Sequence, residues 1–63
     1  MNKSEQREVE MIRKYIIVGM TDTAARALSA LIRAARTNKS RAALMELAGS
    51  SGWGLINHPE FII

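Results

Sequence analysis

The chain contains no cysteine, only one proline and only one histidine, and each shortage excludes a class of protein. Without cysteine it can form neither a disulfide nor a thiolate metal site, and this composition suits a reducing compartment. The polar start "MNKSEQREVE" lacks the apolar core of a signal peptide, and no apolar run approaches the ~20 residues of a membrane span. We therefore expect a cytoplasmic protein with no membrane-spanning segment.

Catalytic and cofactor motifs are missing as well. His58 lies beside Pro59 in a predicted turn, and no serine, threonine or aspartate is placed to complete a triad with His58 and Glu60. The stretch "GSSGWG" lacks the lysine that follows in a phosphate-binding loop. A metal would need His58 plus scattered carboxylates, with no helical i, i+4 pair among them. We predict that the protein is not an enzyme and takes no cofactor, metal or small-molecule substrate.

Acidic residues are fewer than basic ones, but the imbalance is mild. Six Asp and Glu stand against nine Lys and Arg, which gives a net charge of +3 over 63 residues. This charge permits contact with nucleic acid or another acidic surface without requiring it. A single small domain, residues 1–63, buries only about 60% of the surface of its unfolded chain. We therefore expect a homo-oligomer, most simply a homodimer.

Amphipathic periodicity predicts an all-α, compact three-helix domain. The expected helices cover residues 3–18, 22–36 and 40–48, approximately. For the first, Asn2 and Glu5 have capping-box spacing, and Gly19 stands where a C-cap glycine is common. The N-caps expected for the other two helices are Thr21 or Asp22, and Asn38 or Ser40. The third helix is expected to end at Gly49.

The second predicted helix has two distinct faces. Its apolar face contains Ala24, Leu28, Leu31 and Ala35. Its polar face contains Asp22, Arg26, Ser29, Arg33 and Arg36. Because alanine side chains are small, another helix can approach the apolar face closely. On the polar face, Arg26 is expected to pair with Asp22 at i, i+4 spacing.

The C-terminal segment is unusually rich in large apolar residues. Its predicted contact residues are Trp53, Phe61, Ile62 and Ile63. Each large apolar side chain left in water forfeits about 1.5–3 kcal/mol, so the segment is expected to be covered. Two arrangements achieve this: the tail packs on the chain's own helices, or it packs on a partner subunit.

Residues 14–48 resemble a ribbon-helix-helix DNA-binding domain. The resemblance is carried by "KYIIVGM", then "DTAARALSALIRAAR", then "TNKSRAALMELA". In that family a short strand precedes a helix-turn-helix, and two chains pair their strands into a ribbon that enters the major groove. The resemblance implies an alternative fold with a strand at 14–20, and a phosphate clamp formed by backbone amides near 38–40. Residues 14–20 are therefore read either as the end of the first helix or as a strand.

The clearest functional signal is a run of basic residues with no acid between Asp22 and Glu46. Its five members are Arg26, Arg33, Arg36, Lys39 and Arg41. We predict that they contact DNA backbone phosphates, which fixes position without reading sequence, in a small DNA-binding protein of transcription regulation. The alternative is a protein–protein interaction module, such as an adaptor or inhibitor, that docks through the apolar tail.

Overall fold

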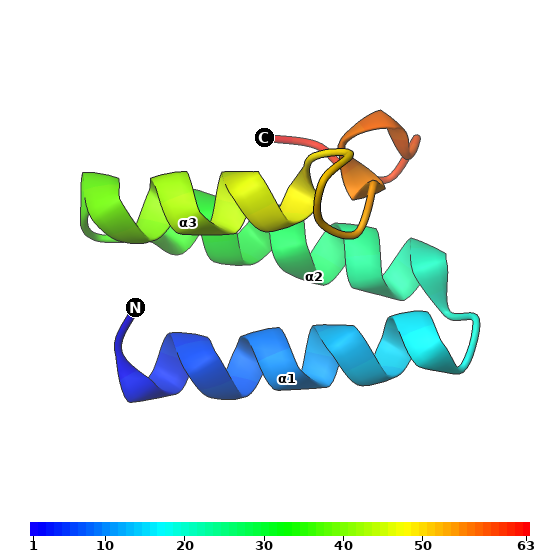
Figure 1. The fold of residues 1–63 in the computed structure, drawn as a ribbon, viewed down its shortest axis with the longest axis horizontal. Helices are drawn as coiled ribbons and strands as arrows, with labels where there is room; N and C mark the ends of the chain where they lie inside the picture. Colours follow the sequence, from blue (N-terminus) through cyan, green and yellow to red (C-terminus); the bar gives the residue numbers. More distant parts are fainter.

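A computed structural model describes all 63 residues and contains three α-helices, a short 3-10 turn and no strand (Figure 1). The helices are α1 (Lys3–Ile17), α2 (Thr21–Ala34) and α3 (Asn38–Ala48), followed by η1 (Leu55–Asn57). The all-α three-helix prediction is therefore confirmed. The ribbon-helix-helix alternative is not supported, because residues 14–17 belong to a helix. None of the helices combines the length and the apolarity that crossing a bilayer demands.

Helix α1 begins where the sequence predicts and ends one residue earlier, at Ile17. The Asn2 side chain accepts the Glu5 N–H at 2.8 Å, and Glu5 Oε1 accepts the Asn2 N–H at 2.9 Å, which completes the capping box. At the other end Gly19 has φ +85°, a conformation that glycine adopts without a Cβ penalty. The Gly19 N–H donates to the carbonyl of Ile16 at 3.0 Å. The chain therefore reverses sharply and α2 runs antiparallel to α1.

The predicted caps of α2 and α3 are wrong. Helix α2 already includes Thr21, and its N-cap, Met20, makes no side-chain capping bond. The helix stops at Ala34, two residues earlier than predicted, because Ala35 is extended with ψ 130°. Thr37 caps α3: it has extended backbone angles, and its side chain accepts the Ser40 N–H at 3.1 Å. Threonine, asparagine and serine are all good cap residues, so backbone conformation decides among them.

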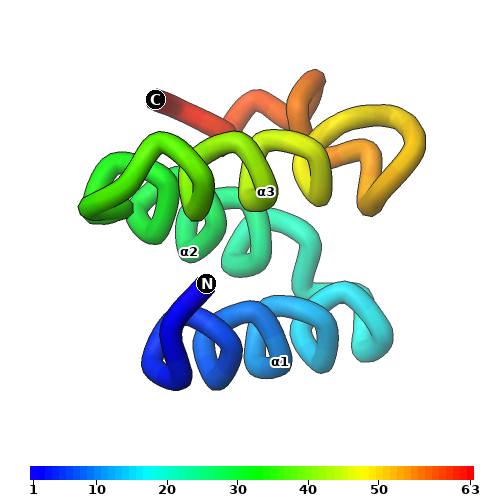
Figure 2. Tube along the Cα trace, turned by 60° about the vertical axis from the view of Figure 1, so that its left-hand side comes forward, coloured from blue at the N-terminus to red at the C-terminus, as the bar shows by residue number.

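Helix α2 is the central element and lies between α1 and α3 (Figure 2). The buried apolar core consists of Ile12, Ala24, Ala25, Leu28, Ile32, Ala35, Leu44, Ala48 and Leu55. Four of these nine are alanines, so the helices approach one another closely and the core has little volume. The larger half-buried side chains around it, Tyr15 among them, supply additional packing.

The two short connections make α1 and α3 parallel, so both helices begin at the same end of the molecule (Figure 1). One contact links their first turns: the hydroxyl of Ser40 donates to Glu5 Oε1 at 3.1 Å. Ser40 is buried, with 7% of its surface exposed. The C-terminal end of α2 also lies here, because α3 follows it after three residues.

The C-terminal tail packs on the chain's own helices, the first of the two predicted arrangements. Leu55 is buried, and Trp53 and Phe61 are half-buried against the core. The Trp53 N–H donates to the carbonyl of Leu47 at 2.7 Å, which attaches the tail to the end of α3. The last two side chains, Ile62 and Ile63, are 63% and 56% exposed. Trp53, Leu55 and Phe61 thus hold the tail on the helices, whereas the last two residues are exposed to solvent.

Candidate nucleic-acid interface

The five basic residues predicted to contact phosphates differ in the hydrogen bonds and ion pairs that they make within the chain. Three of them donate hydrogen bonds within the chain. Arg26 Nη1 lies 2.8 Å from Glu60 Oε1, Arg33 Nη1 donates to the Ile62 carbonyl at 2.6 Å, and Arg41 Nη2 donates to the Ala35 carbonyl at 3.1 Å. All three side chains remain on the surface.

The predicted pair of Asp22 with Arg26 is wrong. Asp22 Oδ1 instead lies 3.0 Å from His58 Nε2, and Arg26 turns toward the tail. Both contacts join α2 to residues more than 30 positions away, Glu60 being 34 from Arg26. Local i, i+4 spacing permits an ion pair on a helix but contributes only about 0.2–0.5 kcal/mol, so a tertiary partner readily replaces it.

Arg36 and Lys39 are the two members of the basic run that make no ion pair or hydrogen bond within the chain. Both are exposed and lie on either side of Thr37, the residue that caps α3. The first turn of α3 contains no acidic residue. Two cationic side chains are therefore presented to solvent at the start of a helix, where no carboxylate of the same helix turn neutralises them.

Lys3 is a further cation at this end of the molecule that was not among the predicted contact residues, and its side chain lines the outer face of α1 and not the hollows beside Arg36. Lys3 begins α1, and the parallel course of α1 and α3 brings it to the same end of the molecule as Lys39 (Figure 1). We call this set the basic end; it consists of Lys3, Arg33, Arg36, Lys39 and Arg41. The signal that identifies Lys3 is topological: two short connections between three helices place the first and third N-termini together.

Glu5 is the one acidic residue in the first turn of α1 and thus close to the basic end. Its carboxylate is already engaged, because Oε1 accepts both the Asn2 N–H and the Ser40 hydroxyl. It forms no ion pair with any of the surrounding cations. The positive charge of the basic end is therefore only partly offset.

The surface of the basic end is hollowed but not enclosed. One hollow of about 370 Å³ is lined by Met1, Asn2, Glu5, Arg36, Thr37, Lys39 and Ser40. A neighbouring hollow of about 400 Å³ is lined by Asn2, Ser4, Glu5, Leu31, Ala34 and Arg36. Both contain more polar than apolar residues, whereas small-molecule sites are deep and mostly apolar. This shape suits an extended polyanion that lies across the surface.

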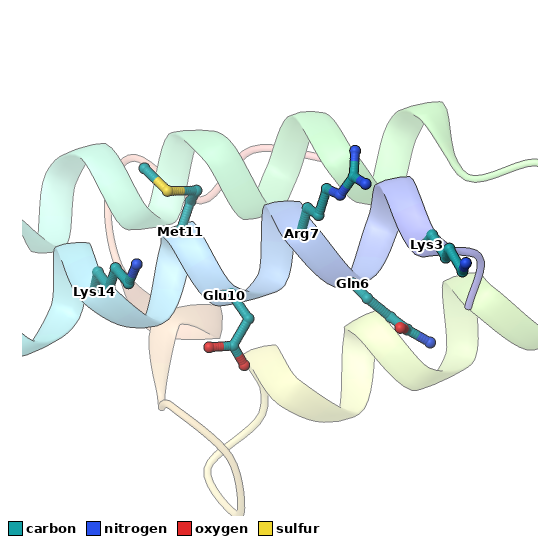
Figure 3. A pocket seen from close by; sticks show the side chains of 6 residues that line it. All are labelled: Lys3, Gln6, Arg7, Glu10, Met11 and Lys14. Carbon is teal, nitrogen blue, oxygen red and sulfur yellow. The ribbon is translucent and has the colours of Figure 1, made fainter.

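The outer face of α1 has the largest hollow, about 650 Å³, but it is not a built site. It is lined by Lys3, Gln6, Arg7, Glu10, Met11 and Lys14, all from one helix. Figure 3 shows these side chains spread along α1 without converging on a common point. Three of the six are cations, so the face continues the positive surface away from Lys3.

Ser29 departs from its predicted place on the polar face of α2, because the tail covers it. Only 1% of its surface is exposed. Its hydroxyl donates to the Ala25 carbonyl at 2.7 Å and accepts the Ile62 N–H at 2.9 Å. Together with the bonds of Arg26 and Arg33, this contact forms a polar seam between α2 and the tail.

His58 has the role of a turn residue, as the sequence indicates. Its Nδ1 accepts the Glu60 N–H at 3.0 Å, so the proton of the neutral ring lies on Nε2, which faces Asp22. Nowhere in the chain do three metal-binding His, Cys, Asp or Glu side chains gather. The ring therefore ties the tail to the start of α2 and fixes the turn that presents Glu60.

No protein-family model, no curated protein and no solved structure matches this chain. What the protein binds must therefore be inferred from its own surface. The most distinctive part of that surface is the basic end, which combines side chains from all three helices.

Proposed function

We propose that the protein is a small, non-enzymatic nucleic-acid-binding regulator that holds DNA backbone phosphates at its basic end. The observation that carries the proposal is the hollow in which Arg36 and Lys39, neither of them paired within the chain, lie beside the engaged carboxylate of Glu5. Lys3, Arg33 and Arg41 add positive charge at the same end of the three helices. Cations that each neutralise one phosphate release condensed counterions, and this release supplies most non-specific affinity for DNA. Arg36 and Lys39 contribute most to this affinity, because neither has to break a contact within the chain before it binds a phosphate.

The helix termini add to the same positive potential. Both α1 and α3 begin at the basic end, and each helix N-terminus carries an effective charge of roughly +0.5, whereas the C-terminus of α2 at the same end carries roughly −0.5, so the three termini leave a net positive contribution. The acid in the first turn of α1, Glu5, offsets part of this charge, whereas α3 has no acid in its first turn. The potential is therefore most positive near Lys39, where side-chain charge and helix dipole act together.

The contacts proposed here are with the backbone and not with the bases. The three aromatic side chains, Tyr15, Trp53 and Phe61, are all half-buried against the core. Rings packed on the core are poor platforms for stacking a base, the usual device for holding single strands. Shallow hollows and flexible cations suit phosphate contacts that fix position without reading sequence.

The proposal is tested by removing Arg36 and Lys39 together, as R36Q/K39Q, and measuring affinity for a duplex of about 20 base pairs over about 50–200 mM salt. Loss of two phosphate contacts reduces the slope of log affinity against log salt concentration by about 1.8 in magnitude. The matched control is R13Q/K14Q, which removes the same charge from the far end of α1. Equal effects of the two double variants would show that net charge, and not the basic end, drives binding.

A second candidate is a protein–protein interaction module, and one observation favours it. Ile17, Val18 and Met20 lie at the turn between α1 and α2 and are 71%, 67% and 48% exposed. Exposed apolar residues of this kind often mark contact surfaces. Of the tail residues predicted to contact a partner, only Ile62 and Ile63 are similarly exposed. Absence of DNA binding would favour this candidate. The homodimer and the cytoplasmic location stay predictions.

A further inference from the structure

The polar seam between α2 and the tail uses one stripe of the helix. Arg26, Ser29 and Arg33 follow at i, i+3 and i+7, so they share a face. The tail meets this stripe with the Glu60 carboxylate and with the N–H and carbonyl of Ile62. A hollow of about 210 Å³ remains between them, lined by Arg26, Ser29, Arg33, Glu60 and Ile62.

The tail presents oxygen atoms, and not apolar side chains, to the two guanidinium groups. Arg26 donates to a Glu60 carboxylate oxygen at 2.8 Å, and Arg33 donates to the Ile62 carbonyl oxygen at 2.6 Å. Ile62 itself is 63% exposed. Guanidinium groups bind carboxylate and phosphate oxygens by the same charge-assisted hydrogen bonds. The stripe therefore has the chemistry of a phosphate-contacting surface, and the tail fills it with substitute oxygens.

We infer that the Arg26–Ser29–Arg33 stripe is a second phosphate-contacting site, and that Glu60 occupies it as a tethered competitor. This inference rests on the proposed function, because the stripe continues the basic end through Arg33, which belongs to both. Arg26 lies seven residues before Arg33, or about 10 Å along the helix axis. A duplex held at the basic end would extend along α2 and bring further phosphates to Arg26.

The competitor is displaceable because its ion pair is open to water. The side chains of Arg26 and Glu60 are 58% and 40% exposed. Exposed ion pairs add little to stability, so a rotation of the Glu60 side chain frees Arg26 while Phe61 stays docked on the core. A polyanion already held at the basic end presents its next phosphates at high effective concentration, which favours this exchange.

The test is E60Q, which keeps the shape of the tail and removes the competing charge. With the duplex used above, we expect about a two- to fivefold tighter Kd and a salt slope steeper by about 0.9, one additional phosphate contact. The matched control is E46Q, which removes the same charge from an exposed position on α3 that forms no ion pair. In an R26Q background the effect of E60Q should disappear.

Each outcome separates the inference from the function on which it rests. A steeper slope for E60Q but not for E46Q, abolished by R26Q, supports the competitor. Identical slopes for E60Q and E46Q overturn the competitor and leave binding at the basic end intact. If neither the native protein nor E60Q binds the duplex at low salt, the proposed function fails and the competitor fails with it. Binding by E60Q alone supports a tail that fully masks the stripe.

Discussion

Replacing Gly52 with alanine is expected to undock the C-terminal tail. A Cβ at this position would lie 2.3 Å from the Leu47 carbonyl oxygen and 2.8 Å from the Leu47 carbonyl carbon and Cα. These are backbone atoms of the last turn of α3, so no side-chain rotation can relieve the clash. The approach is fixed by the adjacent hydrogen bond from the Trp53 N–H to the same carbonyl, at 2.7 Å. Either this bond breaks or the end of α3 moves.

The expected cost is large for a chain of this size. Forcing extra atoms into a packed site typically costs about 1–3 kcal/mol. A domain of 63 residues has a free energy of unfolding of roughly 3–9 kcal/mol at the usual value per residue. Gly52→Ala therefore removes a substantial fraction of the stability, or releases the tail before the helices unfold. Leu55, a tail residue that is buried in the core, would then become exposed to water.

Urea unfolding distinguishes these outcomes, because the single tryptophan, Trp53, lies in the tail. Its fluorescence reports tail docking, while far-UV circular dichroism reports the helices. The control is Gly49→Ala, where φ is −70° and the nearest atom to an added Cβ is 3.4 Å away. A Gly52→Ala protein as stable as Gly49→Ala, with coincident transitions for both probes, would refute the close approach of tail and helix.

Two further stability predictions concern the helix start and the tail. Asn2→Ala removes the capping box of α1 and should lower the free energy of unfolding by about 1 kcal/mol, with Ser4→Ala as an exposed control that makes no capping bond. An equal effect of the two variants would exclude the cap. Phe61→Ala should cost about 1–3 kcal/mol, because the ring packs on the core, whereas Ile63→Ala should change stability by less than about 0.5 kcal/mol. The reverse order in urea unfolding would mean that the outer end of the tail is its anchor.

Local signals account for most of the fold. The capping box of Asn2 with Glu5, the glycine at 19 and the alternation of α2 are all encoded within a few residues, and the helices follow them closely. The N-caps of α2 and α3 were less predictable. Near α3, Thr37, Asn38 and Ser40 are all capable caps, and only the path of the preceding connection decides which of them is extended.

The site was only partly predictable, because its missing features are long-range. The predicted basic run is present, but Arg26 and Arg33 bind tail residues 34 and 29 positions away. Ser29 is buried by the same tail, which no helical periodicity reveals. Lys3 joins the basic end from the opposite end of the sequence. Its position follows from the up-down-up order of three helices, a topological deduction and not a motif.

The most direct measurement is the affinity of the native protein for duplex DNA at about 50 and 200 mM salt. If three to five phosphates are neutralised at the basic end, the affinity falls about 40- to 500-fold across this range. Such a fall, shallower in R36Q/K39Q than in R13Q/K14Q, is the result that the proposed function predicts. No binding at the lower salt concentration, or an affinity that does not change with salt, would contradict it and direct attention to the exposed turn of Ile17, Val18 and Met20.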